Sequence, residues 1–180
     1  MRIRSLALLL TLAAAPGVAG AQGMGTSQGS RSGGIAAVEP FYQMFKGWII
    51  ASAEQMAESN YSFKPTPEVR SFGEIIGHLA NENYLFCAAA IGENDPNKGH
   101  DFEKVTSKDE MVQGIKAAFA YCDKAYQMPD EKLMEPVTFF GQRNSRLWVL
   151  NFNVTHDAEH YGNLITYLRL KGMVPPSSQR

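Results

Sequence analysis

The sequence predicts an all-α protein that folds as a four-helix bundle. Four stretches of about twenty residues carry apolar side chains at helical spacing. Two of these stretches begin with the pattern of a helix capping box. No stretch shows the alternation of apolar and polar residues that is typical of a strand. The chain has 180 residues, of which 44% are hydrophobic, so it can form one domain with a substantial core.

The N-terminal residues differ from the predicted helices. Arg2 and Arg4 precede an uncharged apolar run over residues 5–15, and small residues follow at positions 19–21. This pattern predicts a secretory signal peptide over residues 1–21, and its apolar run is too short to span a bilayer. Residues 22–34 are rich in Gly and Ser and predict a flexible leader, which leaves residues 35–180 as the folded domain. We therefore expect an exported protein, periplasmic or secreted, without stable membrane insertion.

The first predicted helix covers residues 36–59, with Pro40 near its start, where a missing N–H costs little. Its expected core stripe is Phe41, Phe45, Trp48, Ile49 and Met56, with Ser52 filling a gap. The second helix begins at a capping box formed by Ser71 and Glu74 and ends near residue 92. Its expected core stripe is Phe72, Ile75, Ile76, Leu79, Asn83, Phe86 and Cys87.

The third predicted helix begins at a second capping box, formed by Ser107 and Glu110. Its expected core stripe is Met111, Ile115, Phe119, Cys122 and Tyr126. Residues 128–145 contain two prolines and a glycine and predict an irregular connection. The fourth helix covers residues 146–171 and ends at Gly172, ahead of two prolines.

Three of the four histidines suggest a metal site. His156 and His160 are four residues apart and therefore share one helix face. That face includes Asn153 and Leu164, so it points inward, where two imidazoles need polar partners. A pair with this spacing also occurs on surfaces without a metal, but His78 on the second helix offers a third ligand. Three protein ligands and one open position are typical of catalytic sites. His100 lies in a loop and is expected to be solvated.

Residues 156–160 also match the H-x-x-E-H pattern of inverted zinc proteases. A protease needs a further acidic ligand downstream, and no Asp or Glu follows His160, so this reading is disfavoured. In that case Glu159 either accepts a hydrogen bond from an imidazole N–H or is a charge that faces solvent, and we favour the second interpretation. The sequence identifies no general base, and Glu82 and Glu159 are the candidates. The side chains considered for the pocket wall are Tyr84, Tyr161 and Asn153.

Residues 63–83 and 156–177 together resemble the DinB-like family, also described as YfiT-like metal-dependent hydrolases. The resemblance extends over about residues 38–177. It implies a bundle in up-down-down-up order and a site in which His78, His156 and His160 match the metal ligands. It further implies a divalent transition metal, zinc or nickel, and a hydrolase or thiol-dependent transferase acting on a small molecule.

The resemblance also bears on the two cysteines. Taken alone, Cys87 and Cys122 lie on apolar helical runs and predict buried free thiols. In the implied topology the second and third helices run parallel, which places both cysteines at similar heights. A disulfide between them is therefore the alternative in an exported protein.

Three functional classes remain open from the sequence. The first is a metal-dependent enzyme, which requires an open pocket and a carboxylate near the metal. The second is a non-catalytic metal-binding protein of the cell envelope or of stress responses, with a sealed site. The third is a helical interaction protein in which the histidines do not converge. The net charge of −1 disfavours nucleic acid as a partner. The small-molecule substrate remains unknown, and a homodimer is compatible with the sequence.

Overall fold

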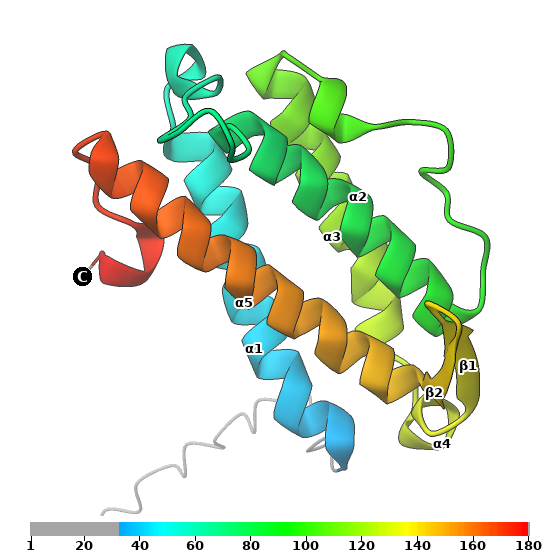
Figure 1. The fold of residues 1–180 in the computed structure, drawn as a ribbon. Coiled ribbons are helices and arrows are strands. Elements are labelled where there is room, and N and C mark those ends of the chain that lie inside the picture. The colour runs from blue at the N-terminus through cyan, green and yellow to red at the C-terminus, as the bar shows by residue number, and fades with distance from the viewer. Residues whose placement is uncertain (1–32, 180) are drawn as a thin grey trace, which may run out of the picture. The chain divides into compact units, whose positions relative to one another are not determined.

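The computed structural model describes residues 33–179, in which four long helices pack side by side (Figure 1). These helices are α1 (Gly34–Gln55), α2 (Phe72–Ile91), α3 (Lys108–Tyr126) and α5 (Arg146–Leu170). The predicted signal peptide and residues 22–32 of the predicted leader lie outside the described residues. None of the helices in residues 33–179 is long and apolar enough to cross a membrane.

The helices follow an up-down-down-up order. In Figure 1, α1 and α5 run in one direction, and α2 and α3 run in the other. Helix α2 packs on both α3 and α5, and α1 packs on α5 and α3. The connection between α2 and α3 travels back along the bundle and includes the short 3-10 helix η2 (Phe102–Lys104). The all-α bundle and the order implied by the resemblance are therefore confirmed.

The predicted core stripes of α2 and α3 are buried, as are Asn153 and Leu164 on the inward face of α5, but the stripe of α1 was wrong at one position. Phe41 is 56% exposed, and Tyr42 is fully buried in its place. The Tyr42 ring stacks on Tyr126 with 3.7 Å between centroids, and its hydroxyl donates to the Phe119 carbonyl at 2.9 Å. Tyrosine suits this position because both its ring and its hydroxyl find partners inside the bundle.

The helix starts follow the predicted capping residues. The Ser71 hydroxyl accepts from the Glu74 backbone N–H at 3.1 Å, and the Glu74 carboxylate accepts from the Ser71 N–H at 2.6 Å. This capping box is complete. Ser107 caps α3 by a single bond from the Glu110 N–H, at 3.3 Å. Helix α1 begins at Gly34 and ends at Gln55, before the predicted residue 59, and the 3-10 helix η1 (Glu58–Asn60) follows it.

The segment predicted to be an irregular connection contains regular structure, so that prediction was wrong. It forms the short helix α4 (Asp130–Leu133) and an antiparallel hairpin of β1 (Pro136–Phe139) and β2 (Gln142–Ser145). Phe140 and Gly141 form the two-residue turn, with φ of 47° and 75°. Two positive φ values are the signature of a type I′ turn, which suits the twist of a hairpin.

Arg146 fixes the base of this hairpin against α2. Its guanidinium donates to the Ala90 carbonyl at 2.6 Å and to the Glu135 carboxylate at 3.2 Å. The hairpin is therefore held at the C-terminal end of α2, beside the first turns of α5.

Cys87 and Cys122 form a disulfide that joins α2 to α3. Their Cα atoms are 5.2 Å apart, within the usual range for a disulfide, and both side chains are fully buried. The pairing follows from the parallel course of α2 and α3, so the disulfide alternative is the one that the structure supports.

Candidate metal centre

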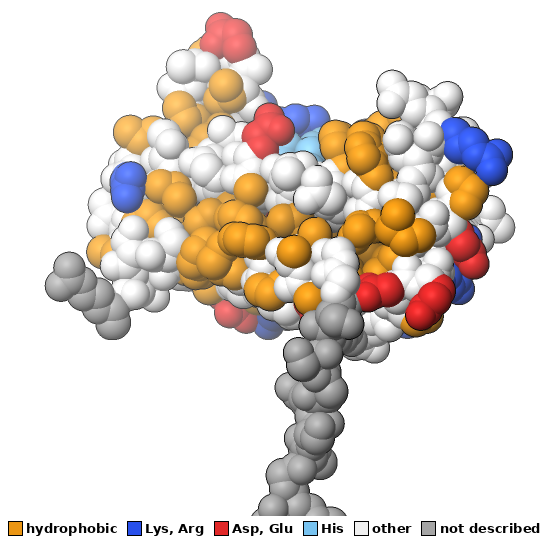
Figure 2. Space-filling model, turned by 90° about the horizontal axis from the view of Figure 1, so that it is seen from below, with side chains coloured by type: hydrophobic (Ala, Val, Ile, Leu, Met, Phe, Trp, Pro, Cys, Tyr) orange, Lys and Arg blue, Asp and Glu red, His pale blue; other side chains and the backbone are white. Residues whose placement is uncertain are grey.

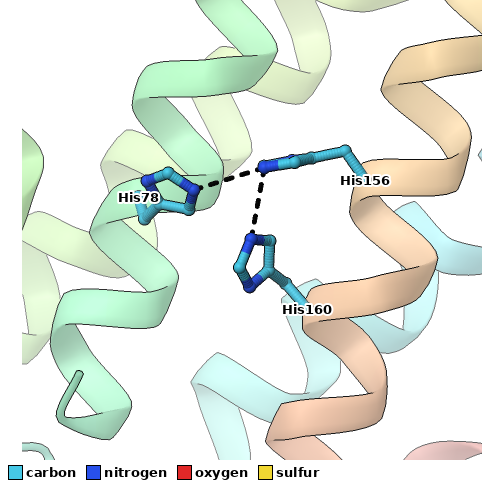
Figure 3. A group of neighbouring side chains, drawn as sticks. All are labelled: His78, His156 and His160. Atoms are coloured by element: carbon cyan, nitrogen blue, oxygen red, sulfur yellow. Dashed lines mark hydrogen bonds between the residues drawn. The ribbon is translucent and has the colours of Figure 1, made fainter. Parts of the chain in front are cut away.

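The three histidines converge between α2 and α5 (Figure 3). His78 comes from α2, and His156 and His160 come from successive turns of α5. The Nε2 atom of His156 lies 3.3 Å from Nε2 of His78 and 3.2 Å from Nε2 of His160. The potential ligand atoms of all three lie within 4.8 Å of one another.

These distances fit a metal better than they fit hydrogen bonds. The Nε2 of His156 carries either one proton or one lone pair, so it cannot bond well to two other ring nitrogens. Two nitrogens bound to a tetrahedral zinc at about 2.0–2.1 Å are roughly 3.3 Å apart, close to the observed spacing. The ligand atoms of His78 and His160 lie within 4.8 Å of each other, so a small rotation of these side chains would let one divalent ion accept all three lone pairs. The donor set suits zinc or nickel.

The protonation of the histidines also suits a metal. Burial, together with the neighbouring His160 and His78, lowers the pKa of His156 to about 3. Burial also lowers the pKa of His160. Both imidazoles are therefore neutral at physiological pH, which is the form that binds a metal.

Glu103 orients His78 and was not predicted from the sequence. Its carboxylate lies 2.9 Å from Nδ1 of His78 and accepts from Nε of Arg70 at 2.9 Å. Because the carboxylate is an acceptor, Nδ1 of His78 carries the proton, and the lone pair on Nε2 faces the other histidines. This arrangement is the common outer support of a metal-bound histidine.

Glu103 lies on the 3-10 helix η2, and the backbone of η2 packs closely against α2. A side chain at Gly77 would clash with the carbonyl of Phe102, so glycine permits the contact. The Asn81 side chain then accepts from the Phe102 N–H at 3.1 Å and donates to Asp101 at 2.9 Å. The glycine before His78 is the only local signal in the sequence for this approach.

The two candidate bases lie in different surroundings. Glu82 is half-buried one turn after His78, and burial raises the pKa of its carboxyl. No hydrogen bond within residues 33–179 holds that carboxylate. Glu159 is exposed on α5, as expected for a solvated charge. Glu82 is therefore the better candidate for a base.

The three residues proposed for the pocket wall lie elsewhere. Tyr161 is buried against Trp48, with 5.2 Å between ring centroids. Tyr84 packs against Phe102 and Tyr121. Asn153 belongs to a polar cluster inside the bundle.

A pocket of about 680 Å³ opens beside His160. Residues 65–70 form one wall and the C-terminal half of α5 forms the other. The polar side chains that line it include Arg70, Asn163, Thr166 and Tyr167. Figure 2 shows a histidine in a hollow between two protrusions, with charged side chains next to it. His160 lines this pocket, so the pocket reaches the histidine group.

A buried polar cluster lies beside the histidines, and it contains a carboxyl that the sequence did not reveal. Asp157 is fully buried and accepts from the Asn83 amide at 2.9 Å. The Asn153 amide lies 3.2 Å from Oδ1 of Asn83 and 3.1 Å from the Tyr126 hydroxyl. Burial raises the pKa of Asp157 to about 8, although the Asn83 hydrogen bond opposes the change. The side chain is therefore mainly protonated at neutral pH.

We expect the substitution Asp157→Asn to stabilise the metal-free protein increasingly as pH rises. The unfolded carboxyl loses its proton near pH 3.8, whereas the folded one keeps it until about pH 8, so the wild type loses stability across that range. The difference in free energy of unfolding should grow by roughly 2 kcal/mol from about pH 6.5 to about pH 8.5. Urea unfolding measures it, and an equal difference at both pH values would refute the buried, protonated Asp157.

Comparison with known proteins finds a matching family profile and a related chain. A sequence profile described as the DinB superfamily matches residues 49–164, a range that contains all three histidines. The uncharacterized protein YjoA of Bacillus subtilis (strain 168) is 27% identical over 127 residues, which are 67% of this chain and 79% of YjoA.

Two solved structures share the fold. A DinB-like protein from Bacillus cereus ATCC 10987 has a TM-score of 0.63 and 17% identity, covering 77% of this chain and 95% of its own. The DinB-like protein YjoA from Bacillus subtilis has a TM-score of 0.63 and 21% identity, covering 80% of this chain and 99% of its own. Because the superfamily profile covers more than half of the sequence, the chain belongs to the DinB superfamily.

Proposed function

We propose that the protein is an exported metal-dependent enzyme that acts on a small molecule by hydrolysis or thiol transfer. His78, His156 and His160 hold one divalent transition ion, zinc or nickel. The observation that carries this proposal is the convergence of three imidazole nitrogens beside an open pocket. Export is inferred from the signal peptide predicted over residues 1–21.

The chemistry follows from the ligand number. Three protein ligands leave a position for a water or substrate atom. When bound, such an ion supplies Lewis-acid activation, which lowers the pKa of a water or thiol. Glu82 would accept the proton that this activation releases, and Glu103 holds His78 in the tautomer that presents its lone pair. Hydrolysis is favoured over thiol transfer because an exported protein lies outside the compartment that keeps small thiols reduced.

A non-catalytic metal-binding protein of the envelope is the second candidate. Its support is the lack of a carboxylate pair free to act on a substrate. Glu103 is engaged by Arg70 and His78, and Glu82 has no hydrogen bond to fix its orientation within the described residues. The open pocket weighs against this candidate, because a structural site is usually sealed by its ligands.

Two glutamate variants separate catalysis from metal binding. In Glu82→Gln we expect the zinc content to stay unchanged while hydrolysis of chromogenic esters and amides falls about 100-fold, as for loss of a general base. In Glu103→Gln we expect zinc affinity to fall about 10–100-fold, since an outer partner of a ligand is lost. Metal titration and initial rates measure the two effects.

The exposed Glu159 provides the matched control, since Glu159→Gln should change neither quantity. Zinc-loaded wild-type protein with no turnover above free zinc would support the non-catalytic candidate. Full activity in Glu82→Gln would show that Glu82 is not the base.

A further inference from the structure

We infer that an aromatic surface beside the histidines binds the apolar part of the substrate. This inference rests on the proposed function and adds a substrate class to it. We call this surface the aromatic shelf. Its accessible part consists of Phe140 on the hairpin and of Trp148 and the half-buried Phe152 on α5, and the buried rings of Phe86 and Phe139 lie beneath them.

The aromatic shelf is continuous with the candidate metal centre. The Phe86 ring meets the His156 ring edge-on, with centroids 5.3 Å apart, and the Phe152 ring lies 6.4 Å from it at 28°. Trp148 stacks on Phe152 at 5.5 Å, and Phe140 lies 6.3 Å from Phe152. Because Phe86 is buried, a ligand group held at the histidines would meet the shelf at Phe152, whose neighbours Phe140 and Trp148 are exposed.

The outer rings of the shelf face solvent. Phe140 is 65% exposed and Trp148 is 39% exposed. Figure 2 shows hydrophobic side chains gathered at one edge of the hollow that contains the histidine. Contiguous exposed aromatic groups next to a concave polar site are typical of ligand-binding surfaces.

The backbone at Phe140 gives an independent reason to assign it a function. Phe140 is the only described non-glycine residue with a positive φ, 47°, and it occupies a turn position that favours Asn or Gly. A bulky residue in this conformation is unfavourable. Burial does not offset this cost, because the ring remains mostly exposed. Such outliers cluster at ligand-binding and catalytic sites.

The chemistry of the two sides of the centre defines the ligand. The shelf is purely aromatic, whereas the lining of the pocket on the other side is mixed and includes the charged Arg70 and Glu68. We therefore assign to this site a small molecule with a polar, metal-binding group and an uncharged apolar group next to it, such as an aryl or branched acyl group. Covering the exposed rings with that group releases water from apolar surface.

Two hydroxamates test the shelf on the zinc-loaded protein. Acetohydroxamate reports the metal alone, and benzohydroxamate adds a phenyl ring. We expect wild-type protein to bind benzohydroxamate about tenfold more tightly than acetohydroxamate, as aromatic contacts allow. In Phe140→Asn this ratio should fall at least about threefold, while acetohydroxamate affinity and zinc content stay unchanged. The melting temperature should not decrease, because Asn-Gly suits the type I′ turn.

The control is Phe41→Gln, which removes a similarly exposed phenylalanine from α1 and should leave the ratio unchanged. An unchanged ratio in Phe140→Asn would overturn the shelf. Failure of both hydroxamates to bind in a zinc-dependent manner would instead overturn the proposed function. A change from dimer to monomer in Phe140→Asn, without a change in the ratio, would show that the surface joins two copies of the chain.

Discussion

Replacing both His156 and His160 with alanine is expected to abolish metal binding. Purified wild-type protein should contain about one zinc or nickel ion per chain, and the double variant should contain less than about a tenth of that. The reason is that His78 alone cannot hold the ion once two of the three converging nitrogens are gone. Elemental analysis by mass spectrometry measures the content.

His100→Ala is the matched control for this experiment. His100 is exposed, and its ring lies edge-on to Phe102 rather than at the histidine group. This variant should keep the full metal content. Equal metal content in the double variant and the wild type would show that the metal binds elsewhere. Circular dichroism of the double variant checks that its helices are retained.

Removing the disulfide is expected to lower the free energy of unfolding more than any of the other substitutions. We expect the double substitution Cys87→Ala and Cys122→Ala to lower the free energy of unfolding by about 3–4 kcal/mol. The bond closes a loop with a sequence separation of 35 residues and therefore restricts the unfolded chain strongly. Urea unfolding of variant and wild type measures the difference. The metal content should remain unchanged, because the two sulfur atoms are bonded to each other and are not among the candidate metal ligands.

The same bond can be tested by thiol chemistry. Wild-type protein denatured without reductant should show no reactive thiol, and reduction should lower its stability to about that of the variant. Two titratable thiols in the unreduced, denatured protein would contradict the disulfide.

Much of the bundle could be predicted because its signals are local. Capping residues such as Ser71 and Ser107 act within one turn, and the apolar stripes repeat with the helix itself. The histidine pair on α5 is also local, because a spacing of four residues determines a shared face. Which of the neighbouring side chains Phe41 and Tyr42 is buried could not be predicted from local signals. It depended on Tyr126 and Phe119, which lie on another helix.

The features that were missed depend on distant parts of the chain. Glu103 reaches His78 only because the backbone of η2 lies against Gly77. Asp157 stands between the two histidines in sequence, yet its burial depends on Asn83 from α2. The hairpin escaped prediction because its strands have only four residues each, β2 contains only polar residues, and the turn has Phe140 where Asn is usual. That exception also marks the residue to which we assign a ligand contact.

Anomalous diffraction from a zinc-soaked crystal, recorded at the zinc absorption edge, tests the three-histidine centre most directly. The predicted result is one strong peak within about 2.0–2.3 Å of Nε2 of His78, His156 and His160 together. A peak at another site, or no peak among these three side chains, would contradict the metal centre.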